Sequence, residues 1–191
     1  MNQREKLTKL LLKQGLIGLL ETKNINQISV KELCTTAGIN RSTFYLHYAN
    51  SFELLESVER EIIDNTRDYL EKIETSADGI SYITAFLDYI RKNDELFTVM
   101  LFKSNDQISF PQRLINEVLS NIDTYLRLDV PDHMKRYTYA YLVNGCLAII
   151  QEWIRAEFEL SSMEVSKLIF TLADHSLVAF ESIERKKPTK A

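Results

Sequence analysis

Residues 29–55, SVKELCTTAGINRSTFYLHYANSFELL, decide the fold of this chain. Two short amphipathic segments flank Ala37-Gly38, and glycine readily adopts the left-handed conformation that a tight turn between helices requires. The second segment is rich in Arg, Ser, Thr, Tyr and His. This pattern is typical of a helix-turn-helix, whose second helix enters a DNA groove.

The residues around these segments predict where each helix begins. Ser29 and Glu32 have the spacing of a capping box, and Asn50 and Glu53 have similar spacing at the start of a longer helix. Asn40 is a favourable N-cap for the second segment. The sequence therefore predicts a helix start at each of these three caps.

The second segment has an inward and an outward face. Phe44 is spaced to pack inward together with Ile39 and Tyr48. The residues left to face outward are Arg41, Ser42, Thr43, Tyr45 and His47.

The composition fits a folded protein built from helices. The chain has 191 residues, of which 45% are hydrophobic and 26% are charged, with five glycines and three prolines. Apolar residues rarely alternate with period two, so we expect an all-α fold. A chain of this length can bury a substantial core.

Charge is divided unevenly along the chain, whose net charge is −4. Residues 1–50 contain seven Lys or Arg against three Asp or Glu, whereas the remainder contains 16 basic and 24 acidic residues. The positive charge therefore lies with the helix-turn-helix, where DNA phosphates would need it. The acidic remainder discourages other surfaces from lying on DNA.

The stretch resembles the N-terminal DNA-binding domain of the TetR/AcrR transcriptional regulators. The matching residues are Ser29-Val30, Leu33-Cys34, Ala37-Gly38-Ile39-Asn40, Thr43 to Tyr48, and Glu53-Leu54-Leu55. The resemblance covers roughly the first quarter of the chain. It implies an N-terminal three-helix helix-turn-helix domain that binds DNA, followed by a C-terminal helical domain for ligand binding and dimerisation.

Two residues depart from the family pattern. Ser51 stands where the family has a lysine that opens the fourth helix, so one usual phosphate contact is missing or moved. Asn24 stands where the family has a glycine after the first helix. Since asparagine tolerates a left-handed cap, we expect this departure to cost little.

The second half of the chain resembles the subgroup that includes the dihydroxyacetone-kinase-operon regulators. This resemblance rests on Gly145, Ile149-Ile150, Trp153-Ile154 and the helix start Ser162-x-Glu164. It does not imply the same ligand.

Apolar periodicity predicts further helices and their division into domains. Expected helices cover residues 3–22, 51–75, 80–92, 96–102, 111–126, 132–158 and 162–183. The inward stripe of the first helix consists of Leu7, Leu10, Leu11 and Ile17. The last helix is expected to have Ser162 as its N-cap. We expect a DNA-binding domain at residues 1–50 and a regulatory and dimerisation domain at 51–185, connected by the helix 51–75. Residues 186–191 form a charged tail.

The resemblance assigns candidate roles in DNA recognition. A homodimer would place two recognition helices in successive major grooves of a palindromic double-stranded site. Arg41 is the best candidate for a guanine contact, and Tyr48 is expected to anchor the helix as well as touch the DNA backbone. The full candidate set is Ser29, Lys31, Asn40, Arg41, Ser42, Thr43, Tyr45, His47 and Tyr48.

The helix expected at 132–158 is apolar almost all round between Tyr137 and Ile154, so it must be covered on several sides. The resemblance implies that the last two helices form the dimer. Candidate interface residues are Gly145, Ala148, Leu172, Ala173, Ala179 and Phe180. The alternative is that these residues pack only within one chain.

The resemblance also implies a small-molecule effector in the second domain. The candidate lining is Phe86, Tyr89, Phe97, Met100, Tyr141, Asn144 and Trp153, although aromatic and methionine residues at helical spacing are often plain core. Asn144 lies on a helix expected to be buried and would need a hydrogen-bond partner. The leading interpretation is a DNA-binding regulator, most simply a repressor. The alternative is a DNA-binding regulator without a ligand pocket, controlled by a protein partner.

Other functional classes lack support in the sequence. Cys34 and Cys146 are expected to be reduced and buried, and His133 and His175 have no ligand set at metal spacing, so we expect no cofactor and no metal. The sequence shows no cluster of titratable groups of the kind that marks an enzyme active site. The longest apolar region, Tyr137 to Ile150, is too short to cross a membrane, so we expect a cytoplasmic protein.

Overall fold

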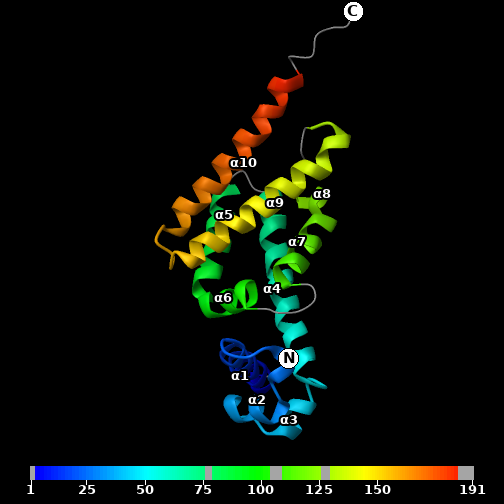
Figure 1. Ribbon diagram of the computed structural model, residues 1–191, viewed down its shortest axis with the longest axis vertical. Helices are drawn as coiled ribbons and strands as arrows, with labels where there is room; N and C mark the ends of the chain where they lie inside the picture. Colours follow the sequence, from blue (N-terminus) through cyan, green and yellow to red (C-terminus); the bar gives the residue numbers. More distant parts are fainter. Residues whose placement is uncertain (1–2, 76–78, 104–108, 126–129, 185–191) are drawn as a thin grey trace, which may run out of the picture. The chain divides into compact units, whose positions relative to one another are not determined.

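The computed structural model describes residues 3–75, 79–103, 109–125 and 130–184, and these residues contain helices and no strand (Figure 1). The prediction of an all-α fold is confirmed. The chain divides into two compact units, of which the first comprises Met1–Asn65 and Asn93–Arg113 and the second Thr66–Lys92 and Leu114–Ala191. The predicted tail, 186–191, lies outside the described residues.

The first unit holds the helix-turn-helix. Its elements are α1 (Gln3–Leu20), the short 3-10 helix η1 (Ile25–Gln27), α2 (Val30–Ala37), α3 (Arg41–Tyr45), the first part of α4 (Ser51–Thr75), α6 (Asp94–Phe102) and the start of α7 (Phe110–Ser120). This unit is larger than the domain predicted at 1–50, because part of α4 and all of α6 belong to it.

Helix α1 packs against α2 and α6 through a stripe that includes the predicted Ile17 but otherwise differs from the prediction. Leu7 and Leu10 are 55% and 50% exposed, so their placement in the inward stripe was wrong. The buried residues of α1 include Thr8, Leu12 and Leu16, which follow one another at intervals of four. Thr8 is tolerated there because its hydroxyl donates a hydrogen bond to the Arg4 carbonyl within the helix, at 3.0 Å.

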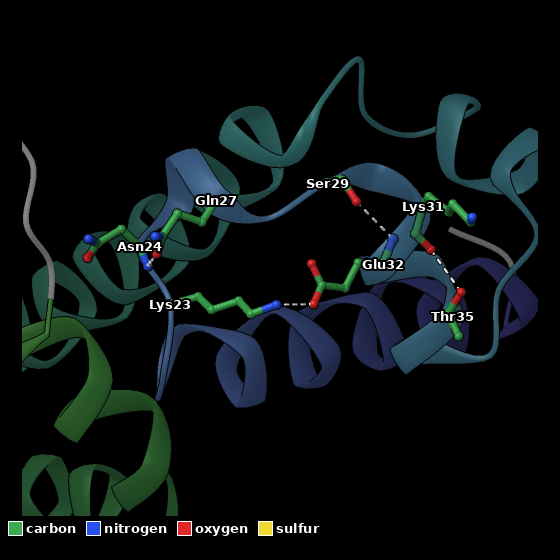
Figure 2. Close-up of polar contacts among 7 residues, drawn as sticks. All are labelled: Lys23, Asn24, Gln27, Ser29, Lys31, Glu32 and Thr35. Carbon is green, nitrogen blue, oxygen red and sulfur yellow. Dashed lines mark hydrogen bonds and ion pairs between the residues drawn. The ribbon is translucent and has the colours of Figure 1, made fainter.

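The segment after α1 does not use a left-handed cap. Asn24 has φ −80° and ψ 154°, in the extended region. Asn24 instead begins η1, and its backbone N–H donates a hydrogen bond to Gln27 Oε1 at 3.0 Å (Figure 2). The link between α1 and α2 is therefore a short, hydrogen-bonded helical turn.

The second unit holds the remaining helices. These are the rest of α4, α5 (Gly79–Lys92), the rest of α7, α8 (Ile122–Tyr125), α9 (Asp132–Arg155) and α10 (Ser162–Glu184). Helix α10 packs against α5 and α9. One core cluster of this unit consists of Ile122, Val130, Tyr139 and Leu142.

The helix expected at 111–126 is interrupted at Asn121, which separates α7 from α8. The Asn121 side-chain amide donates a hydrogen bond to the Glu117 carbonyl at 3.1 Å. The Asn121 backbone N–H bonds to Val118, in the tighter spacing typical of a helix end. Asparagine side chains compete for backbone groups in this way, which explains the break.

The connection between α9 and α10 also differs from the prediction. Helix α9 ends at Arg155 rather than Phe158, because Glu157 and Phe158 adopt positive φ angles of 51° and 60°. The cap of α10 is Ser161 rather than Ser162. Ser161 Oγ accepts from the Glu164 N–H at 3.3 Å, and Glu164 accepts from the Ser161 N–H at 2.8 Å. The Ser161 hydroxyl also donates to the Glu164 carboxylate at 2.6 Å, and this bond, together with the one from the Ser161 N–H, holds the pKa of Glu164 below its ordinary value.

Among the described residues, helix α9 is covered on some sides and exposed on others. Tyr137 and Tyr141 are 66% and 64% exposed. Asn144 is also exposed, and its amide donates a hydrogen bond to the Ala140 carbonyl at 2.8 Å. Asn144 therefore needs no buried partner.

Candidate nucleic-acid interface

Helix α2 begins at the predicted cap. Ser29 Oγ accepts a hydrogen bond from the Glu32 N–H at 3.2 Å, which satisfies one of the free donors of the first turn (Figure 2). The Glu32 carboxylate forms an ion pair with Lys23, which precedes η1. The Ser29–Glu32 pair thus supplies the serine half of the predicted capping box. The glutamate ties α2 to the residues that follow α1.

The turn between α2 and α3 depends on Gly38. Gly38 has φ 66° and ψ 28°, a left-handed conformation that residues with a Cβ rarely adopt. The Gly38 N–H donates to the Thr35 carbonyl, and the next N–H, of Ile39, donates to Cys34 at 2.9 Å. The turn is therefore closed by hydrogen bonds to the end of α2, as the sequence predicted.

The inward face of α3 is fixed by two aromatic residues. Phe44 is fully buried and Tyr48 is 9% exposed, with their ring centroids 5.9 Å apart. The Ser57 hydroxyl of α4 donates a hydrogen bond to the Tyr48 hydroxyl at 3.4 Å. Tyr48 therefore anchors α3 on α4, and its ring belongs to the core rather than to the exposed face.

The other predicted contact residues are accessible. Ser29, Lys31, Asn40, Arg41, Ser42 and Tyr45 are exposed, and Thr43 and His47 are partly buried. Sequence reasoning missed Leu46, which is 80% exposed. Its position four residues after Ser42 could have revealed it, because residues four apart on a helix share a face.

Positive charge is partly neutralised within the first unit. Lys9 lies 3.0 Å from Glu5, Lys13 lies 2.7 Å from Glu61, and Lys23 pairs with Glu32. The hydrogen bond from Lys9 lowers the pKa of Glu5. Among the predicted contact residues, Lys31 and Arg41 carry positive charge on exposed side chains, and Figure 2 shows Lys31 pointing away from the Lys23–Glu32 pair.

The start of α4 is tied to the helix-turn-helix. Asn50 Oδ1 accepts from the Glu53 N–H at 3.0 Å and Glu53 accepts from the Ala49 N–H at 2.5 Å, which confirms this predicted capping pair. Ser51 is buried, and its hydroxyl donates to the Ile28 carbonyl at 3.0 Å. Where the family pattern has a lysine, this chain therefore has an internal hydrogen bond just before the α2 cap.

The candidate interface residues of α9 and α10 fall into two groups. Ala148 and Leu172 are exposed, and a Cβ added at Gly145 would meet no atom within 4 Å. Ala173 packs against the core cluster around Tyr139, so it has a role within the chain. The side chains of Ala179 and Phe180 lie outside the described part.

The candidate ligand residues are divided between the two units. Phe97 and Met100 are buried in the first unit, whereas the other candidates belong to the second. Trp153 is 4% exposed, and its indole N–H donates to the Leu160 carbonyl at 2.8 Å. Tyr141 and Asn144 are exposed.

Phe86 and Tyr89 do lie together, in an aromatic cluster with Tyr69 of α4. The ring centroids are 5.4 Å apart for Tyr69 and Phe86, 6.0 Å for Tyr69 and Tyr89, and 6.5 Å for Phe86 and Tyr89. All three residues are partly buried. The Lys72 ammonium lies 5.6 Å from the centre of the Tyr69 ring, which is cation–π distance.

Cys34 is buried, as expected, whereas Cys146 is only partly buried. Burial raises the pKa of the Cys34 thiol, an effect that the positive charge of Arg41 opposes, and burial also raises the pKa of Cys146. Within the described part of the chain, no three His, Cys, Asp or Glu residues gather in a way that could hold a metal ion. No described helix is long and apolar enough to cross a membrane.

Comparisons with known proteins agree with this architecture. The chain is 24% identical over 179 residues to the uncharacterized HTH-type transcriptional regulator YxbF of Bacillus subtilis (strain 168), a match that covers 84% of this chain. The chain spans only 43% of the length of YxbF.

Two solved structures are similar in fold. A TetR transcriptional regulator from Streptococcus agalactiae 2603V has a TM-score of 0.61 and 19% identity, over 90% of this chain and 96% of that one. The dihydroxyacetone kinase operon activator DhaS has a TM-score of 0.57 and 21% identity, over 91% of this chain and 97% of that one. These likenesses support an N-terminal helix-turn-helix followed by a helical domain.

The TetR_C_8 family, described as the transcriptional regulator C-terminal region, matches residues 78–175. The match covers most of the second unit, which the helix-turn-helix resemblance did not include. It confirms the family predicted from the sequence: the chain belongs to the TetR-type transcriptional regulators.

Proposed function

We propose that this transcriptional regulator binds a palindromic operator in duplex DNA as a homodimer, with one α3 helix in each of two successive major grooves. The observation that carries the proposal is the surface of α3. Phe44 and Tyr48 fix one side of this segment in the core, which leaves Arg41, Ser42 and Tyr45 exposed. Their side chains can donate hydrogen bonds to base edges and phosphates.

The proposed dimer would use the exposed apolar residues of α9 and α10. Tyr137 and Tyr141 are four residues apart on α9, and Leu168 and Leu172 are four apart on α10, so each pair occupies one face of its helix. Exposed apolar surface often marks a protein–protein contact. A second copy of the chain would cover these exposed residues and would also supply a second recognition helix.

Selection of genomic fragments tests DNA recognition. The purified protein is mixed with sheared genomic DNA, and the fragments that it retains are sequenced. A palindrome shared by the retained fragments supports the proposal. Diffuse retention that disappears with added salt would mean that α3 binds phosphates without reading sequence, and would favour a regulator that depends on a protein partner.

We also propose that a small-molecule effector binds at the cluster of Tyr69, Phe86 and Tyr89. Partly buried aromatic rings offer a flat apolar surface on which a ligand ring can stack. A bound effector changes DNA affinity only if it prefers one of two conformations of the dimer. A thermal-shift screen of small aromatic compounds tests this site, because a ligand that stabilises the wild type should lose that effect in Phe86→Ala.

The most direct mode of control is repression. A dimer on an operator that overlaps a promoter would block polymerase, and release by the effector would restore transcription in the cytoplasm. A reporter gene placed behind the recovered operator distinguishes the modes: repression predicts lower expression with the protein present, and activation predicts higher expression.

A further inference from the structure

Leu46 is a large apolar residue that the fold leaves in solvent. At 80% exposure it is more exposed than any other large hydrophobic residue of the described chain. Its backbone is helical, with φ −73° and ψ −18°, and its N–H donates to the Thr43 carbonyl at 3.3 Å. The helical turn of α3 therefore continues through Leu46 and fixes the direction of its side chain.

That direction is away from the core. Leu46 lies midway between Phe44 and Tyr48, both buried, and two residues along a helix correspond to roughly half a turn. Ser42 precedes Leu46 by four residues and shares its face, and Tyr45 beside it is 57% exposed. Leu46 thus lies on the outward face of the recognition segment, together with the proposed DNA contacts.

The chemistry of Leu46 limits what it can contact there. A leucine side chain has no hydrogen-bonding group, so it gains nothing from a phosphate or from the polar edge of a base. The apolar group that a major groove presents is the C5-methyl of thymine. Exposed Arg41 on the same segment favours polyanionic DNA as the occupant of this surface.

We propose that Leu46 determines specificity by packing against the C5-methyl group of a thymine in each half-site. This inference rests on the proposed function, because it requires α3 to lie in the major groove. It assigns Leu46 a role in telling thymine from other bases, while Arg41 remains the candidate for guanine.

Removal of single methyl groups from the DNA tests the inference. In the selected operator, each thymine is replaced in turn by uracil, which keeps the hydrogen-bonding groups and lacks only the methyl. Binding is measured by fluorescence anisotropy for the wild type, for Leu46→Ala and for Leu10→Ala, a control that truncates an exposed leucine of α1. Because Leu46 is exposed, Leu46→Ala should melt at the same temperature as the wild type.

The expected result is a position at which uracil weakens wild-type binding by about fourfold, the factor for one methyl group removed from water. Leu10→Ala should keep this discrimination, and Leu46→Ala should lose it. Equal discrimination by wild type and Leu46→Ala at every position, or none by the wild type on an operator that it binds specifically, would overturn the role of Leu46 alone. A wild type with no sequence preference at all would overturn the proposed function and this inference with it.

Discussion

At the scale of single residues, the proposed DNA-binding surface depends on which positively charged side chains are left exposed and without an ion pair within the described part of the chain. Lys9, Lys13 and Lys23 form ion pairs with glutamates, whereas Arg41 is exposed at the start of α3. An arginine can donate two parallel hydrogen bonds to guanine, which a lysine cannot match in geometry. Arg41 is therefore the residue at which base specificity should be most sensitive to substitution.

Arg41→Ala should weaken operator binding by about 1–3 kcal/mol and relax the preference at one base of each half-site. Arg41→Lys is the matched control: it should keep most of the non-specific, salt-dependent affinity and still lose the base preference. Anisotropy titrations against operators changed at single positions measure both effects. Unchanged specificity in Arg41→Ala would remove Arg41 from the set of base contacts.

Ser51, in contrast, is a buried residue whose side chain stabilises the fold and is not proposed to contact DNA. Ser51→Ala would leave the buried Ile28 carbonyl without its hydroxyl donor, and should lower the free energy of unfolding by about 1–3 kcal/mol. Urea denaturation measures this loss, with the exposed Ser42→Ala as a control expected to change stability by less than about 0.5 kcal/mol. Equal stability of both variants would contradict the structural role of Ser51.

At the scale of elements, local sequence signals predicted some features and missed others. The cap at Ser29, the turn at Gly38 and the capping pair of Asn50 and Glu53 depend on residues three or four apart, so the sequence contains what is needed to predict them. The inward face of α1 depends on how α1 packs against α2 and α6, where a Cβ added at Gly15 would lie 3.2 Å from Ala37 Cβ. That contact is not local, and the predicted stripe was right at Ile17 but wrong at Leu7 and Leu10.

The candidate site was predictable to a similar extent. The outward residues of α3 follow from helical spacing around Phe44, and only Leu46 was overlooked because an apolar residue is usually assigned to a core. The internal role of Ser51 depends on its approach to Ile28, which is 23 residues earlier in the chain. The ligand candidates fall in both units because α6 joins the first unit, which helical periodicity cannot show.

The start of α10 gives a direct test of cap assignment. Ser161→Ala removes the hydroxyl that accepts the Glu164 N–H, and should lower the free energy of unfolding by about 1 kcal/mol. Ser162→Ala is the neighbouring control. Ser162 Oγ is buried, and no hydrogen-bond partner for it is found among the described residues, so its loss should be neutral or stabilising. Thermal denaturation that ranks Ser162→Ala as the more damaging change would show that the cap lies at Ser162.

At the scale of the whole molecule, the proposed recognition of a palindrome requires a second copy of the chain. Leu172 is 48% exposed on α10, and a carboxylate there would have to be buried on dimerisation without a partner. Leu172→Glu should therefore be monomeric at micromolar concentrations, as measured by light scattering, and should bind the operator weakly. Phe170 is 43% exposed and lies on another flank of α10. Comparison of Phe170→Glu with Leu172→Glu by light scattering identifies which flank contacts the partner. A Leu172→Glu protein that remains a dimer would contradict this placement.

The central claim is that two α3 helices read two segments of one duplex, and hydroxyl-radical footprinting on the recovered operator tests it most directly. A dimer with two recognition helices should give two protected segments related by two-fold symmetry, with centres one helical turn apart, about 34–36 Å. The Arg41→Ala protein should lose the protection of both DNA segments together. A single protected segment, or uniform weak protection along the fragment, would contradict recognition by a symmetric dimer.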